Sequence, residues 1–262
     1  MLYLSHTADK ECGIPINTDP TSDDRIIGGK ETCSGCIPWQ VALILKEKVD
    51  GKTKSVCGGT ILSSRFVLTA AHCFYNGSLP GSLVAPKHLI QILAGATNLD
   101  DPVATRHDIA QLYQHKMYNH GYGFSHDFTM LKLKDEINLS PAHLARAVCL
   151  PKPDVVFDSN TEFLASGWGK VERGNQTSVR NLKDTKLQFV QPDECQSKWK
   201  DFEDEKIRPL LPPGTPYLFR IDSSMICAGR DNSDTTSCDG DSGGKSSLAS
   251  STELYWLGTK VT

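Results

Sequence analysis

Short apolar stretches separated by turn-forming residues constrain the fold of this chain more than any other feature. Stretches rich in β-branched and apolar residues occupy residues 40–45, 66–68, 89–93 and 128–133, with Gly, Asn, Asp and Pro between them. Many short strands joined by turns are typical of β-sandwiches and β-barrels. Helical periodicity is weak. The sequence therefore predicts an all-β fold.

One helix is predicted within this pattern, near residues 192–200. Asp193 stands at its start, where a short polar side chain can cap the first turn.

Size and charge exclude several classes of protein. The chain has 262 residues, of which 39% are apolar, enough for one large domain or two small ones with a real hydrophobic core. Its net charge of -3 provides no basic surface for nucleic acid, and no long uncharged apolar run could cross a bilayer. We therefore expect neither nucleic acid nor a membrane as a partner.

The nine cysteines are scattered along the chain, at positions 12, 33, 36, 57, 73, 149, 195, 227 and 238. This usage favours disulfides formed in an oxidising compartment. Zinc is the competing interpretation of the C-x-x-C at residues 33–36, but no second pair with ligand spacing follows it. Sequons beginning at Asn76, Asn138 and Asn175 fit a secreted glycoprotein. A secreted, extracellular protein is expected.

The first 25 residues are mostly polar and end in a turn-forming, charged run, which predicts a linker. Residues 1–6 have neither a basic start nor a sustained apolar core, so they do not form a signal peptide. We expect the N-terminus to be incomplete or already trimmed.

A candidate nucleophile lies near the C-terminal end of the chain. Ser242 stands between Asp241 and two glycines, and such small neighbours allow a tight turn and the close approach of a substrate. A serine hydroxyl also needs an imidazole to take its proton, and that imidazole needs a carboxylate to orient it. His72 lies among small residues, and Asp127 and Asp108 each follow a histidine. Spacing alone does not decide which histidine and which carboxylate are the partners of Ser242. The serine stretch by itself also fits an ordinary loop.

Nine motifs then occur in a fixed order along almost the whole chain. They are Arg25-Ile26-Ile27-Gly28-Gly29, Pro38-Trp39-Gln40-Val41, Cys57-Gly58-Gly59-Thr60, Leu68-Thr69-Ala70-Ala71-His72-Cys73, His126-Asp127-Phe128-Thr129-Met130-Leu131, Val148-Cys149-Leu150-Pro151, Gly167-Trp168-Gly169, Met225-Ile226-Cys227-Ala228-Gly229 and Gly240-Asp241-Ser242-Gly243-Gly244. Together they resemble the chymotrypsin-like (trypsin-fold) serine proteases.

The resemblance implies a fold and a division of the chain. It implies two six-stranded antiparallel β-barrels, the first spanning residues 26–140 approximately and the second residues 141–262 approximately. The second barrel would lack its last strand and the C-terminal helix. Residues 1–25 would be a propeptide, and residues 26–262 the serine protease domain.

The resemblance also assigns catalytic roles. Ser242 would attack the peptide carbonyl, His72 would accept and return the proton, and Asp127 would orient His72. Backbone N–H groups of Gly240 and Ser242 would form the oxyanion hole. Cleavage after Arg25 would free the amino group of Ile26 to pair with Asp241, so the enzyme would be made as an inactive zymogen.

The resemblance pairs six of the cysteines. The implied disulfides are Cys57–Cys73, Cys195–Cys227 and Cys12–Cys149, the last tethering the propeptide after cleavage. The state of Cys33 and Cys36 stays open, because their spacing is tighter than that of the short bridge in some clotting-type relatives. Cys238 is left alone, since its partner in relatives lies beyond residue 262, and the chain is expected to be a truncated copy of a longer protease.

The residues of the expected substrate pocket depart from the trypsin pattern. Thr236, Ser237 and Asp239 would line it, and Thr236 stands where relatives that cut after arginine or lysine carry an aspartate. A hydroxyl cannot neutralise a buried cation, so an uncharged P1 side chain is favoured. Ala96 and Arg106 stand where the family's calcium ligands would lie, so no metal or other cofactor is expected.

Two further departures lie outside the pocket. Phe163 and Leu248 occupy positions at which many relatives carry a disulfide, which predicts a packing contact in its place. The long segment between Cys195 and Cys227, residues 196–226, is open to two interpretations. It is either a solvated surface insertion or a loop that restricts substrates or binds a partner.

These features predict a secreted serine endopeptidase of restricted specificity that is activated by cleavage after Arg25. Its partners would be a protein or peptide substrate, an activating protease and protein inhibitors. The alternative is a catalytically inactive protease homologue that acts as a binding or regulatory protein.

Overall fold

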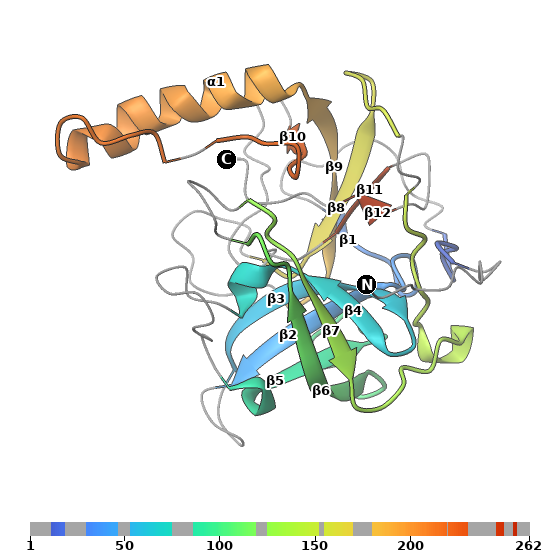
Figure 1. The fold of residues 1–262 in the computed structure, drawn as a ribbon. Helices are drawn as coiled ribbons and strands as arrows, with labels where there is room; N and C mark the ends of the chain where they lie inside the picture. The colour runs from blue at the N-terminus through green and yellow to red at the C-terminus, as the bar shows by residue number, and fades with distance from the viewer. Residues whose placement is uncertain are drawn as a thin grey trace.

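The computed structural model describes residues 12–18, 30–46, 53–74, 86–118, 125–151, 155–169, 180–218, 220–229, 245–248 and 254–255. The strands are β1 (Lys30–Glu31), β2 (Gln40–Lys46), β3 (Thr53–Ser63), β4 (Phe66–Thr69), β5 (Ile90–Ala94), β6 (Thr105–Gln114), β7 (Thr129–Leu133), β8 (Glu162–Gly167), β9 (Lys183–Val190), β10 (Cys227–Gly229), β11 (Lys245–Leu248) and β12 (Leu254–Tyr255). Strands β2–β7 form one body and the remaining strands form a second, with helix α1 (Pro192–Phe202) beside the second (Figure 1).

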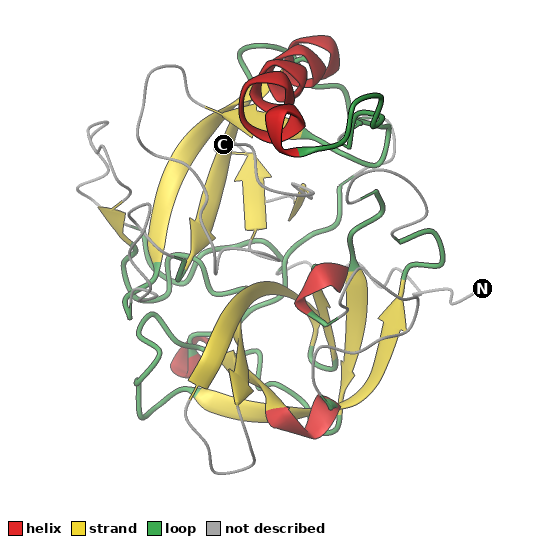
Figure 2. Ribbon diagram, turned by 90° about the vertical axis from the view of Figure 1, so that its left-hand side faces the viewer, coloured by secondary structure: helices red, strands yellow, loops and turns green. Residues whose placement is uncertain are grey.

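Strands β2–β7 close into an antiparallel barrel in the order β2-β3-β4-β7-β6-β5, which confirms the predicted first barrel. Figure 2 shows this barrel as a ring of strands. Along β7, Thr129, Leu131 and Leu133 are buried while the residues between them are partly exposed. This alternation places one face of β7 in the barrel core. The core also takes in Trp168, which is fully buried, from outside the barrel strands.

Strand β3 shows why glycine is needed inside this barrel. A Cβ atom added to Gly59 would lie 2.8 Å from Leu43 Cδ1 and 3.0 Å from Val41 Cγ2, so a larger residue would force the core apart. Gly59 therefore permits close packing between β2 and β3. Two consecutive glycines would otherwise indicate an interruption of the strand.

The second body is a six-stranded antiparallel sheet. Its described strands follow the path β1-β9-β8-β11-β12, and β10 pairs with β9 on the same edge as β1, opposite β8. Strand β1 comes from the N-terminal part of the chain, yet it joins this sheet through the pairs Lys30↔Asp184 and Glu31↔Lys183. A buried hydrogen bond from Thr32 Oγ1 to Asp184 Oδ2, 2.7 Å long, fastens this crossing.

The predicted neighbourhood of Phe163 and Leu248 is observed in the backbone. Leu248 on β11 is the register partner of Phe163 on β8. Phe163 is fully buried, and its ring contacts Phe157 and Phe189 at centroid distances of 5.3 and 6.5 Å. Aromatic rings therefore pack around Phe163, and its contact with the Leu248 side chain stays a prediction.

Helix α1 confirms the helix predicted near residues 192–200, but the predicted cap is wrong. Gln191 occupies the N-cap position without a side-chain capping bond, and Pro192 begins the helix. Proline suits this position because a backbone N–H in the first turn has no acceptor within the helix, so its absence costs no hydrogen bond. Asp193 lies within the first turn, where its charge still favours the positive end of the helix.

The 196–226 segment begins within α1, and hydrogen bonds and ring contacts join its residues to one another. A π-helical turn (Glu203–Ile207) and a 3₁₀ turn (Arg208–Leu210) follow the helix. Glu203 is buried and accepts a 2.6 Å hydrogen bond from the backbone N–H of Leu218. Nearby, the Tyr217 hydroxyl donates to Asp204, and the Arg208 guanidinium lies over the Tyr217 ring. The described part of the segment is thus folded and held by its own side-chain contacts.

Disulfides join the three predicted pairs, Cys12–Cys149, Cys57–Cys73 and Cys195–Cys227. The structure also joins Cys33 to Cys36, the pair that the sequence left open.

The short N-terminal stretch 12–18 lies against the loop that the Cys33–Cys36 disulfide closes. The backbone N–H groups of Ile16 and Asn17 both donate to the carbonyl of Gly35, at 2.9 and 3.1 Å. Non-covalent contacts thus add to the Cys12–Cys149 tether.

Among the described residues, no helix combines the length and apolar character needed to span a membrane.

Candidate active site

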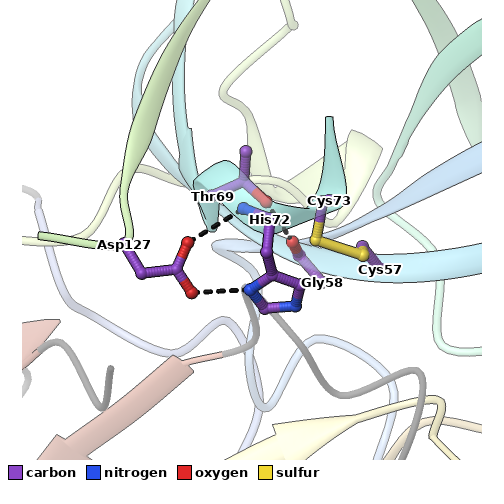
Figure 3. Close-up of a disulfide and its surroundings, with 6 residues drawn as sticks. All are labelled: Cys57, Gly58, Thr69, His72, Cys73 and Asp127. Atoms are coloured by element: carbon purple, nitrogen blue, oxygen red, sulfur yellow. Dashed lines mark hydrogen bonds and ion pairs between the residues drawn. A yellow bond between two sulfur atoms is a disulfide. The ribbon is translucent and has the colours of Figure 1, made fainter. Parts of the chain in front are cut away.

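His72 is mounted at the end of the barrel strand β4. The chain leaves β4 at Thr69 and turns through a short 3₁₀ helix, Ala71–Cys73, which carries the histidine. Thr69 Oγ1 donates a buried 2.7 Å hydrogen bond to the carbonyl of Gly58, and the Cys57–Cys73 disulfide ties the turn to β3 (Figure 3). Both links hold the histidine turn onto the barrel.

Asp127 precedes the neighbouring barrel strand, β7, which pairs with β4 through the register Thr69↔Thr129. Its side chain is fully buried, whereas the His72 side chain is 25% exposed. Two adjacent strands of one barrel therefore bring together residues 55 positions apart in sequence. One partner faces the protein interior and the other reaches solvent.

Both carboxylate oxygens of Asp127 contact His72, as Figure 3 shows. Oδ1 accepts the backbone N–H of His72 at 2.9 Å, and Oδ2 lies 2.5 Å from the ring Nδ1. Because a carboxylate only accepts hydrogen bonds, the short contact requires a proton on Nδ1. The lone pair of the neutral ring then lies on Nε2, on the opposite edge. This tautomer is the one that can take a proton from a hydroxyl.

Tyr118, which the sequence did not single out, is buried close to this pair. Burial raises the pKa of its hydroxyl, and the negative charge of Asp127 raises it further. Tyr118 therefore stays neutral beside the carboxylate over the physiological range. No sequence pattern indicated this proximity, because Tyr118 lies on a turn after β6 and outside any strand.

The competing carboxylate has another partner. Asp108 lies on β6 and accepts a 3.0 Å hydrogen bond from the Lys134 ammonium group. Its neighbour His107 bonds through Nε2 to Thr105 Oγ1 at 2.9 Å. Geometry therefore selects Asp127 as the partner of His72.

The other predicted site residues lie outside the described residues. They are the nucleophile and oxyanion-hole residues Ser242 and Gly240, the activation residues Arg25, Ile26 and Asp241, the pocket residues Thr236, Ser237 and Asp239, and the lone Cys238.

Comparisons with known proteins identify the family of the chain. The Trypsin family model matches residues 26–254. Coagulation factor IX of Oryctolagus cuniculus is 29% identical over 232 residues, which cover 86% of this chain and 70% of that protein. Serine protease filzig of Drosophila melanogaster is 27% identical over 240 residues, which cover 91% of this chain but only 13% of that protein.

A solved structure shares the fold. The scabies mite inactivated protease paralogue S-D1 superposes with a TM-score of 0.67 at 23% identity, covering 86% of this chain and 83% of that one. At this identity the likeness concerns the fold alone. The match of the family model across most of the chain decides the family, and the chain belongs to the trypsin family of serine endopeptidases.

Proposed function

We propose that this chain hydrolyses peptide bonds through a triad of Ser242, His72 and Asp127. The observation that carries the proposal is the doubly bonded His72–Asp127 pair, with contacts of 2.9 and 2.5 Å. Asp127 orients the ring and stabilises its charged form while His72 holds the serine proton. Backbone N–H groups of Gly240 and Ser242 stabilise the developing oxyanion, and removing one such donor typically costs about 3 kcal/mol of barrier.

The enzyme is made as a zymogen, and cleavage after Arg25 activates it. The freed ammonium group of Ile26 pairs with Asp241 and so completes the oxyanion hole beside Ser242. The Cys12–Cys149 disulfide and the contacts of residues 16–17 with Gly35 support this division of the chain into residues 1–25 and 26–262. They would hold the propeptide on the protease domain after the cut.

The substrate is a protein or peptide with an uncharged P1 side chain. Thr236, Ser237 and Asp239 line the pocket, and the threonine provides no charge to balance a buried arginine or lysine. Disulfides and the secreted character of the family support an extracellular enzyme. An activating protease and protein inhibitors are the further expected partners.

A peptide-library assay tests these claims together. The full chain is cut after Arg25 and incubated with peptides that vary at P1, beside a Ser242→Ala variant and an uncleavable Arg25→Gln variant. We expect hydrolysis only by the cut chain that retains Ser242, with apolar or small P1 residues preferred. Hydrolysis after arginine or lysine would overturn the pocket assignment. No hydrolysis by folded, correctly cut protein would favour the binding homologue.

A further inference from the structure

The residue before Asp127 has an unusual backbone conformation. His126 has a φ of 53°, in the left-handed region that residues with a Cβ atom seldom adopt. Its carbonyl accepts a 2.8 Å hydrogen bond from the N–H of Phe128, so the chain turns sharply around Asp127 itself. The direction of the Asp127 carboxylate therefore depends on what holds His126 in place.

Two serines hold His126. Ser224 Oγ accepts the backbone N–H of His126 at 3.0 Å, and Ser125 Oγ lies 2.7 Å from the His126 ring Nδ1. The His126 ring also stacks on His115, with centroids 4.7 Å apart and planes only 4° from parallel. The backbone N–H, the ring nitrogen Nδ1 and the ring face of His126 thus each have a contact.

Asp222 sets the direction of these hydrogen bonds. Its Oδ2 accepts the Ser125 hydroxyl at 2.5 Å, and its Oδ1 accepts both the hydroxyl and the N–H of Ser224, at 2.5 and 2.7 Å. Each hydroxyl has only one proton. Since both protons point at the Asp222 carboxylate, both hydroxyl oxygens are acceptors, and both can accept an N–H of His126. This proton count also places a proton on Nδ1 of His126.

The charge of Asp222 is maintained by the same bonds. Burial alone would raise the pKa of its carboxyl, but the hydrogen bonds from Ser125 and Ser224 outweigh burial and hold the pKa below its usual value. Asp222 is therefore ionised throughout the neutral range.

Asp222 and Ser224, which we call the clamp, belong to the 196–226 segment. Asp222 lies 97 residues from Ser125 in sequence. Ile221 N–H donates to Gln196 Oε1 on α1 at 2.9 Å, and the chain reaches the Cys195–Cys227 disulfide soon after Ser224. The far end of the segment is thus fixed to the helix on one side and to the His126 turn on the other.

We propose that Asp222 and Ser224 are positioning residues, which hold the left-handed backbone of His126 and thereby aim Asp127 at His72. The inference rests on the catalytic role proposed for Asp127. It gives the 196–226 segment a role beyond that of a solvated surface insertion, because its C-terminal end supports the site directly.

The test compares Ser224→Ala and Asp222→Asn with a matched control, Tyr217→Phe, which removes the Tyr217–Asp204 hydrogen bond of the same segment. The first measurement is the NMR signal of the His72 Nδ1 proton in the full, uncut chain, which does not require Ser242 to react. We expect this signal to broaden through faster solvent exchange in the two clamp variants and to be unchanged in the control.

The second measurement is hydrolysis by the chain cut after Arg25. We expect kcat to fall by up to about 100-fold in both clamp variants with KM nearly unchanged, because the reacting groups and not the substrate contacts are displaced. Ser224→Thr, which keeps the hydroxyl, should retain activity. In a His126→Gly background, Ser224→Ala should cost much less, because glycine adopts positive φ without support.

The outcomes separate this inference from the proposed function. Folded clamp variants with the wild-type His72 proton signal and wild-type kcat would overturn the inference while leaving the triad intact. An inactive wild type whose His72 signal still broadens in the variants would overturn the triad and support the clamp. If Asp222→Asn does not fold, Ser125→Ala and Ser224→Ala decide the matter in the same way.

Discussion

The two bodies of this protein are built differently. The N-terminal barrel is closed, and its core joins buried residues from all six strands. In the C-terminal sheet, the buried cluster within the described residues consists of Phe163, Leu187 and Ala228, with partly buried neighbours. His72 and Asp127 both belong to the closed barrel, whereas the clamp on His126 comes from the C-terminal half. Rigid mounting of the pair thus comes from the barrel, and its fine alignment comes from outside it.

The largest expected effect is on the barrel-mounted pair. In Asp127→Asn the amide can donate to the His72 Nδ1, which favours the wrong tautomer, and kcat should fall about 10⁴-fold with the fold intact. Steady-state kinetics of the cut chain measure this loss. Asp108→Asn is the matched control, because Asp108 bonds to Lys134 on the outside of the barrel and should leave kcat unchanged.

Core substitutions compare the stability of the two bodies. Leu131→Ala in the barrel should cost about 2–5 kcal/mol and Phe163→Ala in the sheet about 3–5 kcal/mol, because both side chains are fully buried. Hydrogen exchange should show the first loss of protection in β4 and β7 for Leu131→Ala, and in β8 and β9 for Phe163→Ala. Uniform loss of protection in both variants would mean that the two bodies unfold as one unit.

A smaller effect is expected where β1 crosses to the sheet. Thr32→Val keeps the shape of the side chain but removes its buried hydrogen bond to Asp184, which should lower the free energy of unfolding by about 1–3 kcal/mol. Denaturant unfolding measures the change. Thr32→Ser retains the hydroxyl, so its free energy of unfolding should fall much less. An equal fall in Thr32→Val and Thr32→Ser would assign the effect to packing.

The amino-acid sequence was sufficient for the strands whose apolar residues carry the signal. Residues 40–45 and 66–68 became β2 and β4 because their side chains fill the barrel core. Strand β3 gave a weaker signal, since Gly58 and Gly59 lower strand propensity and the need for Gly59 appears only when Leu43 packs against it.

The candidate site was predictable in part. The resemblance named His72 and Asp127, and strand pairing explains why they meet. The clamp was not predictable, because Asp222 and Ser125 carry no local pattern and come together only through the path of the 196–226 segment. The left-handed φ of His126 has only a weak signal in its residue type, because histidine adopts positive φ more often than most residues but still seldom.

The smallest expected effect concerns pH and the barrel alone. Burial lowers the pKa of His107 on β6 from its usual 6.5, and the charge of Asp135 offsets this only in part. His107 therefore binds a proton more readily in the unfolded chain than in the folded one. Its contribution to the free energy of unfolding is fully present above pH 6.5 and is lost as the pH falls below that value. Unfolding measured at about pH 7.5 and about pH 5.5 should show lower stability in acid, and less so in His107→Gln. An equal pH dependence in both proteins would contradict this assignment.

In the proposed mechanism, His72 and Asp127 activate Ser242 once the chain is cut after Arg25. Labelling with a fluorophosphonate probe, followed by intact mass spectrometry, tests it most directly. We predict one probe per molecule of chain cut after Arg25, and no labelling of the uncut chain or of Ser242→Ala. Folded, correctly cut protein that does not react, or that reacts equally without Ser242, would contradict the proposed mechanism.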